Sequence, residues 1–208
     1  MYAKATGAAC NGLNGVCITV EVDLARGLPG FEIVGLADTA VKEARERVRT
    51  ALRNSGYRFP LNRITVNLAP ANLRKDGSAL DLPIAVGILA ASGYLPQDKV
   101  DGKLFIGELS LEGGIRGVNG VLPMVLEARR CGVKELYLPP QNAGEGALAE
   151  GLRIFAPATL RELTACLLGK HRILRPFASS LFESGGNDVP CPDFADVHGQ
   201  ALAKRGLE

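Results

Sequence analysis

The sequence predicts an α/β fold, with α+β as the broader class, because stretches of strand character alternate along the chain with stretches of helical period. The chain has 208 residues, of which 47% are apolar and 22% charged, a composition typical of a globular protein with a buried core. Glycine occurs 25 times and tryptophan is absent, so we expect an aliphatic core and many tight turns. Disorder over the whole chain is excluded.

Local patterns give the individual elements. Val16–Asp23 alternates with β-branched residues, and residues 31–34 follow the Gly27–Gly30 turn, so these two strands predict a β-meander. A helix is expected from Asp38, because apolar residues recur at three- and four-residue steps until Asn54-Ser55-Gly56 ends the pattern. The further predicted strands cover 64–68, 105–109 and 136–138, and the further predicted helices cover 79–91, 120–130 and 159–168.

The character of the chain changes after residue 168. Residues 1–168 hold the predicted elements and are expected to form one domain. Residues 169–192 are rich in Pro, Ser and Gly, which predicts a linker. Residues 193–208 begin a new element at the end of the chain, and we expect them to be the start of a second, truncated module.

The cysteines and the hydropathy bear on redox state and location. Without a CxxC pair, and with only His171 and His198 as additional ligands, the cysteines predict reduced, mostly buried thiols and no metal site. No apolar run reaches the roughly 18 residues of a membrane span, and no signal-peptide core is present, so we expect a cytoplasmic protein without membrane contact. The five cysteines are Cys10, Cys17, Cys131, Cys166 and Cys191.

Two segments have superficial similarity to catalytic motifs. No Gly-x-x-x-x-Gly-Lys-Ser/Thr sequence is present, so the chain has no P-loop, and the glycine-rich residues 107–117 predict a turn between two strands. Ser78 precedes a predicted helix and is followed three residues later by Asp81. This spacing favours a capping role for Ser78, and the alternative is a serine nucleophile activated by a lysine.

Basic residues are concentrated in one part of the chain. Residues 42–75 carry nine basic and two acidic side chains, so this segment is +7 while the remainder of the +2 chain is −5. Lys42, Arg45, Arg49 and Arg53 share one face of the predicted helix, which suits a phosphate backbone. The alternative is a solvated or subunit-facing surface, because Lys42 with Glu46 and Glu43 with Arg47 have the spacing of helix ion pairs. The candidate DNA contacts are Lys42, Arg45, Arg49, Arg53, Arg74 and Lys75.

Several blocks of the sequence, in one order, resemble the N-terminal domain of the ComM/YifB family, the magnesium-chelatase-like AAA+ ATPases of bacteria. The resemblance covers about residues 1–168. The blocks are Gly27-Leu28-Pro29-Gly30-Phe31, Ile33-Val34-Gly35-Leu36, Val41-Lys42-Glu43, Arg45-Glu46-Arg47-Val48-Arg49, Arg63-Ile64-Thr65-Val66-Asn67-Leu68-Ala69-Pro70-Ala71, Asp81-Leu82-Pro83-Ile84-Ala85 and Gly107-Glu108-Leu109-Ser110-Leu111.

The resemblance implies a fold like that of the proteolytic domain of Lon, of the ribosomal protein S5 domain 2 type. Lon-like proteases use a serine and lysine dyad. The segment Lys75-Asp76-Gly77 places the serine position at Ala79, and Val118-Asn119-Gly120-Val121 places the lysine position at Leu122. Because neither side chain can act as nucleophile or base, we expect a domain without peptidase activity.

The resemblance also implies a function for the whole protein, an ATP-driven ring acting in DNA branch migration during natural transformation and recombination. This chain would contribute DNA or subunit contacts and would bind no cofactor itself, whereas the missing ATPase module, which would begin within 193–208, would bind ATP and Mg²⁺. The expected partners are DNA and further copies of the protein. The alternatives are a purely structural ring-assembly module and, less favoured, a serine peptidase using Ser78.

Overall fold

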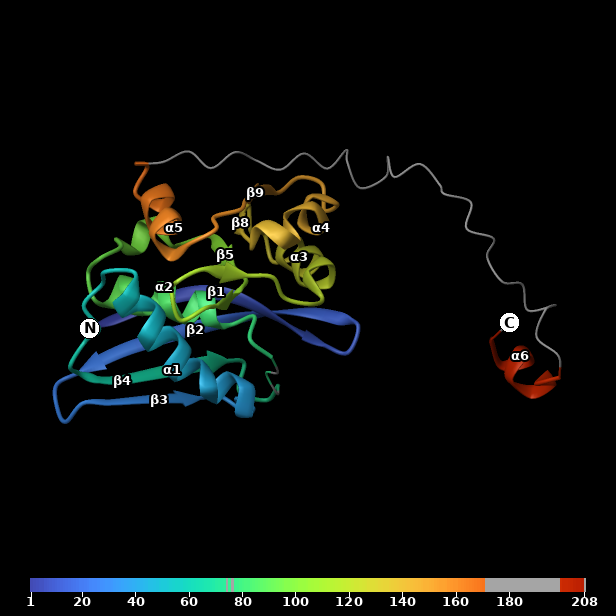
Figure 1. Ribbon diagram of the computed structural model, residues 1–208, viewed down its shortest axis with the longest axis horizontal. Helices are drawn as coiled ribbons and strands as arrows, with labels where there is room; N and C mark the ends of the chain where they lie inside the picture. The colour runs from blue at the N-terminus through green and yellow to red at the C-terminus, as the bar shows by residue number, and fades with distance from the viewer. Residues whose placement is uncertain (74, 76, 171–198, 208) are drawn as a thin grey trace. The chain divides into compact units, whose positions relative to one another are not determined.

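The computed structural model describes residues 1–73, 75, 77–170 and 199–207 (Figure 1). The chain divides into two units, Met1–Ala178 and Ser179–Glu208. In the second unit the described residues contain the helix α6 (Ala201–Leu207), whereas most of the predicted linker and the first residues of the predicted second module lie outside the described residues. Among the described helices, none has both the length and the apolar character needed to cross a membrane.

The first unit is built on a mixed seven-stranded sheet in the order β3-β4-β2-β1-β5-β8-β9. The pairs β1–β2 and β2–β4 are antiparallel, and the other four pairs are parallel. The strands are β1 (Tyr2–Asn11), β2 (Asn14–Ala25), β3 (Gly30–Val34), β4 (Arg63–Ala69), β5 (Lys103–Phe105), β8 (Glu135–Tyr137) and β9 (Arg153–Phe155). Mixed strands and helices confirm the predicted α/β class.

The predicted β-meander is wrong. Strand β3 does not pair with β2, because β4 lies between them and β3 runs parallel to β4, with Gly30 opposite Arg63 and Val34 opposite Asn67. The helix α1 (Thr39–Asn54) forms the crossover that this parallel pair requires. Strand β3 is therefore an edge of the sheet, and α1 follows it directly.

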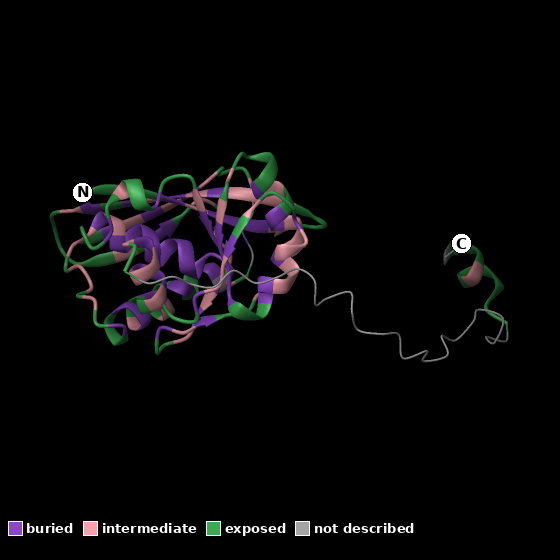
Figure 2. Cartoon of the chain, turned by 90° about the horizontal axis from the view of Figure 1, so that it is seen from above, coloured by how far each residue is buried: buried purple, intermediate pink, exposed green. Residues whose placement is uncertain are grey.

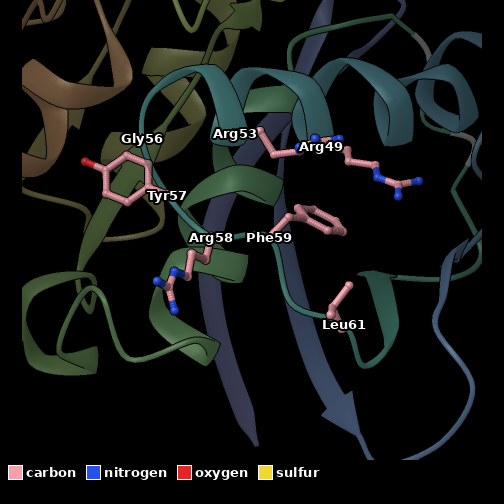
Figure 3. A pocket seen from close by; sticks show the side chains of 7 residues that line it. All are labelled: Arg49, Arg53, Gly56, Tyr57, Arg58, Phe59 and Leu61. Carbon is pink, nitrogen blue, oxygen red and sulfur yellow. The ribbon is translucent and has the colours of Figure 1, made fainter.

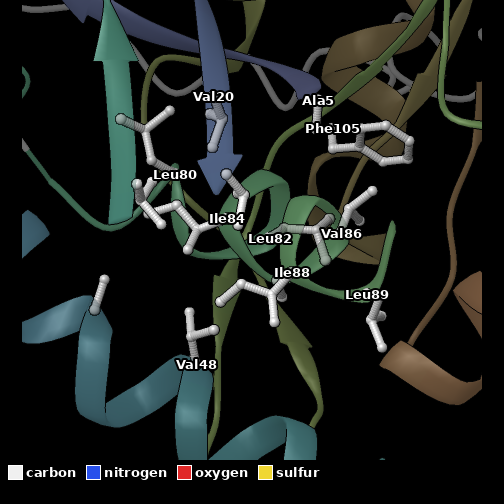
Figure 4. Packing of buried hydrophobic residues seen from close by; sticks show 14 of the residues in the cluster. Ala5, Val20, Val48, Leu80, Leu82, Ile84, Val86, Ile88, Leu89 and Phe105 are labelled. Atoms are coloured by element: carbon white, nitrogen blue, oxygen red, sulfur yellow. The ribbon is translucent and has the colours of Figure 1, made fainter. Parts of the chain in front are cut away.

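Helix α2 (Asp81–Ala91) lies between α1 and the strands (Figure 4). Ten of its eleven residues are buried. On one side it packs against β1 and β2, whose inward residues include Ala5 and Val20, and on the other side Val48 of α1 approaches it. A helix that is apolar on all sides needs neighbours on all sides, and these two layers supply them.

The remaining elements cover the other end of the sheet. The predicted turn between two strands is confirmed, because β6 (Glu108–Leu109) and β7 (Ile115–Arg116) form an antiparallel pair around residues 110–114. A second apolar cluster includes residues of α3 and buries Ala8, Leu104 and Leu136. Figure 2 shows the buried residues of the first unit in purple, gathered in its interior. The other helices are α3 (Val121–Arg130), α4 (Ala143–Ala147), α5 (Leu160–Leu167) and the short 3-10 helices at Gln97–Lys99 and Pro140–Asn142.

Candidate nucleic-acid interface

Helix α1 carries the predicted basic face on its exposed side. Its N-cap is Asp38, whose carboxylate accepts a hydrogen bond from the Val41 amide at 2.7 Å. Val41, Ala44 and Val48 are buried toward α2. The opposite side therefore faces solvent and carries the exposed residues Lys42, Arg45, Arg49 and Arg53. We call these four residues the basic stripe.

The residues of the basic stripe make hydrogen bonds but no ion pairs within the described part of the chain. Of the two ion pairs expected from the spacing, Arg47 and Glu43 approach to 3.9 Å, whereas in the described part of the chain no carboxylate lies within ion-pair distance of a stripe residue. Arg45 instead donates to the carbonyls of Lys42 and Phe31, at 3.1 and 3.4 Å. The stripe residues therefore form no ion pair among the described residues, although Glu32 lines a hollow together with Lys42 and Arg45.

The C-terminal end of α1 reverses the chain in a Schellman motif. The amide of Gly56 donates to the carbonyl of Arg53, and the amide of Tyr57 donates to that of Leu52, each at 3.0 Å. Gly56 has a φ of +86°, a conformation that a residue with a side chain adopts at a cost. This turn brings Arg58 and the residues after it back beside the last two turns of α1.

A hollow of about 620 Å³ lies at this reversal (Figure 3). Three arginines line it, namely Arg49 and Arg53 from α1 and Arg58 from the following loop. The guanidinium carbon of Arg49 lies 5.7 Å from the centre of the Phe59 ring, a cation–π contact. Leu61 forms part of the wall although its side chain is 81% exposed. We call this hollow the arginine pocket; its lining is completed by Gly56 and Tyr57.

The structure places Lys75, one of the candidate DNA contacts, in the interior and not on the exposed face of α1. Its side chain is fully buried, and its ammonium donates to the carbonyls of Gly35, at 2.8 Å, and Pro70. Burial lowers the pKa of this ammonium. Lys75 therefore holds the loop after β4 against the loop between β3 and α1. The neighbouring candidate Arg74 lies outside the described residues.

Arg47 lies on the same helix as the basic stripe, but its side chain pairs with a buried carboxylate. Its Nε and Nη2 donate to the two carboxylate oxygens of Asp81, at 2.7 and 3.0 Å, and Asp81 also accepts from the Leu109 amide at 3.2 Å. Burial raises the pKa of the Asp81 carboxyl, and the Arg47 guanidinium opposes this shift. The hydrogen bond to Asp81 raises the pKa of Arg47. The pair fixes α1 to the start of α2.

The predicted capping role of Ser78 is also wrong. Helix α2 begins at Asp81, its N-cap position is Leu80, and that end has no side-chain cap. The Ser78 hydroxyl donates instead to the carboxylate of Glu108. Because the Lys75 ammonium is bound to carbonyls, it is not the base that a serine nucleophile would need, and no other lysine among the described residues contacts the Ser78 hydroxyl.

The two positions aligned with the protease dyad carry hydrocarbon side chains. Ala79 is buried, and its carbonyl accepts a hydrogen bond from the Gly107 amide at 3.1 Å. Leu122 is half-buried in the first turn of α3, where its amide donates to Glu145 at 2.8 Å. Ala79 and Val121, the residue before Leu122, belong to the same apolar cluster.

None of the four cysteines in the described part of the chain forms a disulfide. They are less buried than predicted, since Cys131 is exposed and Cys10, Cys17 and Cys166 are half-buried. Burial raises the pKa of Cys17 to about 12. Among the described residues no three His, Cys, Asp or Glu side chains gather as metal ligands, and both histidines lie outside those residues.

Comparison with known proteins identifies relatives over nearly the whole chain. Residues 20–142 match the family described as subunit ChlI of Mg-chelatase. The uncharacterised protein YifB of Salmonella typhimurium is 44% identical over 200 residues, covering 96% of this chain and 38% of its own length. The competence protein ComM of Haemophilus influenzae is 42% identical over 205 residues, covering 96% of this chain and 39% of its own length.

A more distant relative bears on the fold. Lon protease 2 of Bacillus subtilis is 27% identical over 162 residues, covering 70% of this chain and 29% of its own length. This similarity agrees with the mixed α/β architecture and with a Lon-like fold. The chain spans less than two fifths of the length of YifB and of ComM. On these matches, the chain belongs to the ComM/YifB family of magnesium-chelatase-like proteins, where it corresponds to the N-terminal domain.

Proposed function

We propose that this chain is the non-catalytic, Lon-like accessory domain of a ComM/YifB-type AAA+ ATPase and that it supplies a nucleic-acid-binding surface. The observation that carries the proposal is the basic stripe, whose four cations are exposed and have no carboxylate partner among the described residues. Arginines in this arrangement can chelate phosphate oxygens and release counterions from a polyanion. The stripe would contact backbone phosphates and would not read base sequence.

The whole protein, in this proposal, is a ring of identical subunits that uses ATP and Mg²⁺ to drive branch migration of DNA in transformation and recombination. The name of the ComM relative, a competence protein, supports the link to transformation. ATP and Mg²⁺ would be bound by the ATPase module, whose first residues we place within 193–208. The basic stripe would hold DNA near that module.

The non-catalytic part of the proposal rests on Ala79, Leu122 and Ser78. The first two side chains offer neither a nucleophile nor a base, and the hydroxyl of the third is bound to Glu108. Casein incubated with the chain should therefore stay intact. Digestion that the wild-type chain performs and Ser78→Ala abolishes would overturn this inference.

Fluorescence anisotropy with a short labelled DNA duplex tests the nucleic-acid surface. For Arg45→Glu/Arg49→Glu we expect Kd to rise at least about tenfold, and the salt slope of log Kd to fall by ~0.9 for each phosphate that the variant no longer neutralises. The matched control is Arg129→Glu/Arg130→Glu, the same charge change on the exposed side of α3. The control should bind more tightly than the stripe variant. Absence of binding by the wild-type chain, or equal losses in both variants, would refute the proposal.

A further inference from the structure

We infer that the arginine pocket is a binding site for one unpaired nucleotide of a single strand, with its phosphate held by Arg53 and Arg58 and its base placed against Phe59. This inference rests on the proposed function and assigns it a substrate class. The basic stripe is open to any polyanion, whereas the pocket joins three cations to an aromatic ring in one hollow. A volume of about 620 Å³ lies within the range of small-ligand sites.

Two of the three pocket arginines, Arg53 and Arg58, make no ion pair with a described residue, whereas Arg49 contacts the Phe59 ring. Arg53 and Arg58 are exposed, and no carboxylate among the described residues pairs with either guanidinium or with that of Arg49. Arg58 is anchored through its backbone instead, because its amide donates to the Tyr94 hydroxyl at 3.0 Å. The backbone that carries the cation is thus fixed while the guanidinium stays available.

The free carbonyls at the C-terminal end of α1 accept hydrogen bonds from a residue other than Arg53. A cation in the last turn of a helix commonly neutralises the free carbonyls there. Here Arg161 of α5 does so, since its Nε donates to the Ser55 carbonyl at 2.8 Å and its Nη2 to the Asn54 carbonyl at 3.5 Å. Arg53 is therefore left to face the pocket, as Figure 3 shows.

The ring of Phe59 gives the pocket its apolar surface. Phe59 is half-buried and packs against Phe31, with ring centres 5.8 Å apart, so its position is fixed before any ligand arrives. Arg49 lies over the ring, and the exposed Leu61 extends the apolar wall. Single-stranded nucleic acid is commonly bound by this combination of cations along the backbone and a ring for the base. In a duplex the bases are stacked on each other and cannot reach Phe59.

Anisotropy titrations with three labelled probes of equal length test the site: an oligothymidylate, an abasic single strand and a duplex. For Phe59→Leu, which keeps an apolar side chain, we expect about a tenfold loss of oligothymidylate affinity and unchanged binding of the abasic strand and the duplex. Arg53→Gln/Arg58→Gln should weaken both single strands severalfold and the duplex less. The matched control is Arg129→Gln/Arg130→Gln, which should leave all three affinities unchanged.

The outcomes separate this inference from the proposed function. If the duplex binds as tightly as the oligothymidylate and Phe59→Leu changes neither, the single-strand site is wrong while the nucleic-acid surface stands. If polyglutamate displaces the oligothymidylate as well as unlabelled oligothymidylate does, the pocket recognises negative charge alone and the inference fails. If no probe binds, the proposed function fails and the inference with it.

Discussion

The basic side chains on and around α1 form two sets, one buried in the interior and the other exposed to solvent. Away from solvent, Arg47 forms a two-point pair with the buried Asp81 of α2, and the fully buried Lys75 donates to two loop carbonyls. On the solvent side, Arg49, Arg53 and Arg58 surround an open hollow without a carboxylate partner in the described part of the chain. All five cations belong to the same +7 segment. The net charge of a segment therefore does not reveal which of its cations are available to a ligand.

Replacing Asp81 should give the largest effect on the buried side of this comparison. Asp81→Ala removes the two oxygens that accept from Arg47 and the one that accepts from the Leu109 amide, so we expect the unfolding free energy to fall by about 3 kcal/mol. Urea denaturation measures this. Glu43→Gln removes only the exposed partner of the same arginine and should cost less than about 0.5 kcal/mol. Equal losses in the two variants would show that the buried pair does not stabilise the fold.

Wild type and Asp81→Ala should also differ in the dependence of their stability on pH. Burial places the pKa of Asp81 in the folded chain above that in the unfolded chain, so the folded chain binds more protons between the two values. The resulting stability is fully present below the unfolded pKa of about 3.9 and is lost as pH rises through the folded pKa. The stability advantage of wild type over Asp81→Ala should therefore grow as pH falls from neutral toward 4. An advantage that shrinks would contradict the raised pKa.

Replacing Lys75 should have a smaller effect on stability than replacing Asp81, and it should leave ligand binding unchanged. Lys75→Met keeps most of the length of the side chain but removes the donor to the Gly35 and Pro70 carbonyls, and we expect a loss of about 1.5 kcal/mol in unfolding free energy. Because the ammonium is buried, duplex affinity measured by anisotropy should be unchanged. A severalfold loss of affinity at unchanged stability would place Lys75 back among the ligand contacts.

The sequence predicted the elements of this fold better than their arrangement. The helical period and the Asn54-Ser55-Gly56 stop located α1, because both signals are local. The position of β3 beyond β4 was missed, since strand order depends on contacts between residues far apart in the chain. The start of α2 was predicted at residue 79, whereas the helix begins at Asp81. A helix that is apolar on every side has no periodic pattern from which the first turn can be recognised.

The candidate site was predicted in part, for similar reasons. The exposed face of α1 follows from the 3.6-residue period, so Arg45 and Arg49 were assigned to it correctly. The burial of Lys75 depends on two carbonyls from other loops, and no local pattern indicates them. Arg58 and Phe59 were not named as site residues. The signal that could have found them is the Tyr57-Arg58-Phe59 run directly after a helix stop, where aromatic and basic residues alternate.

The burial of α2 has a mechanical consequence for the surface above it. Because α2 has almost no solvent-facing side, α1 cannot separate from the domain without exposing a whole apolar helix to water. The two helices should therefore open only as one cooperative unit. A ligand bound along the basic stripe would therefore rest on a surface that the core holds in one position.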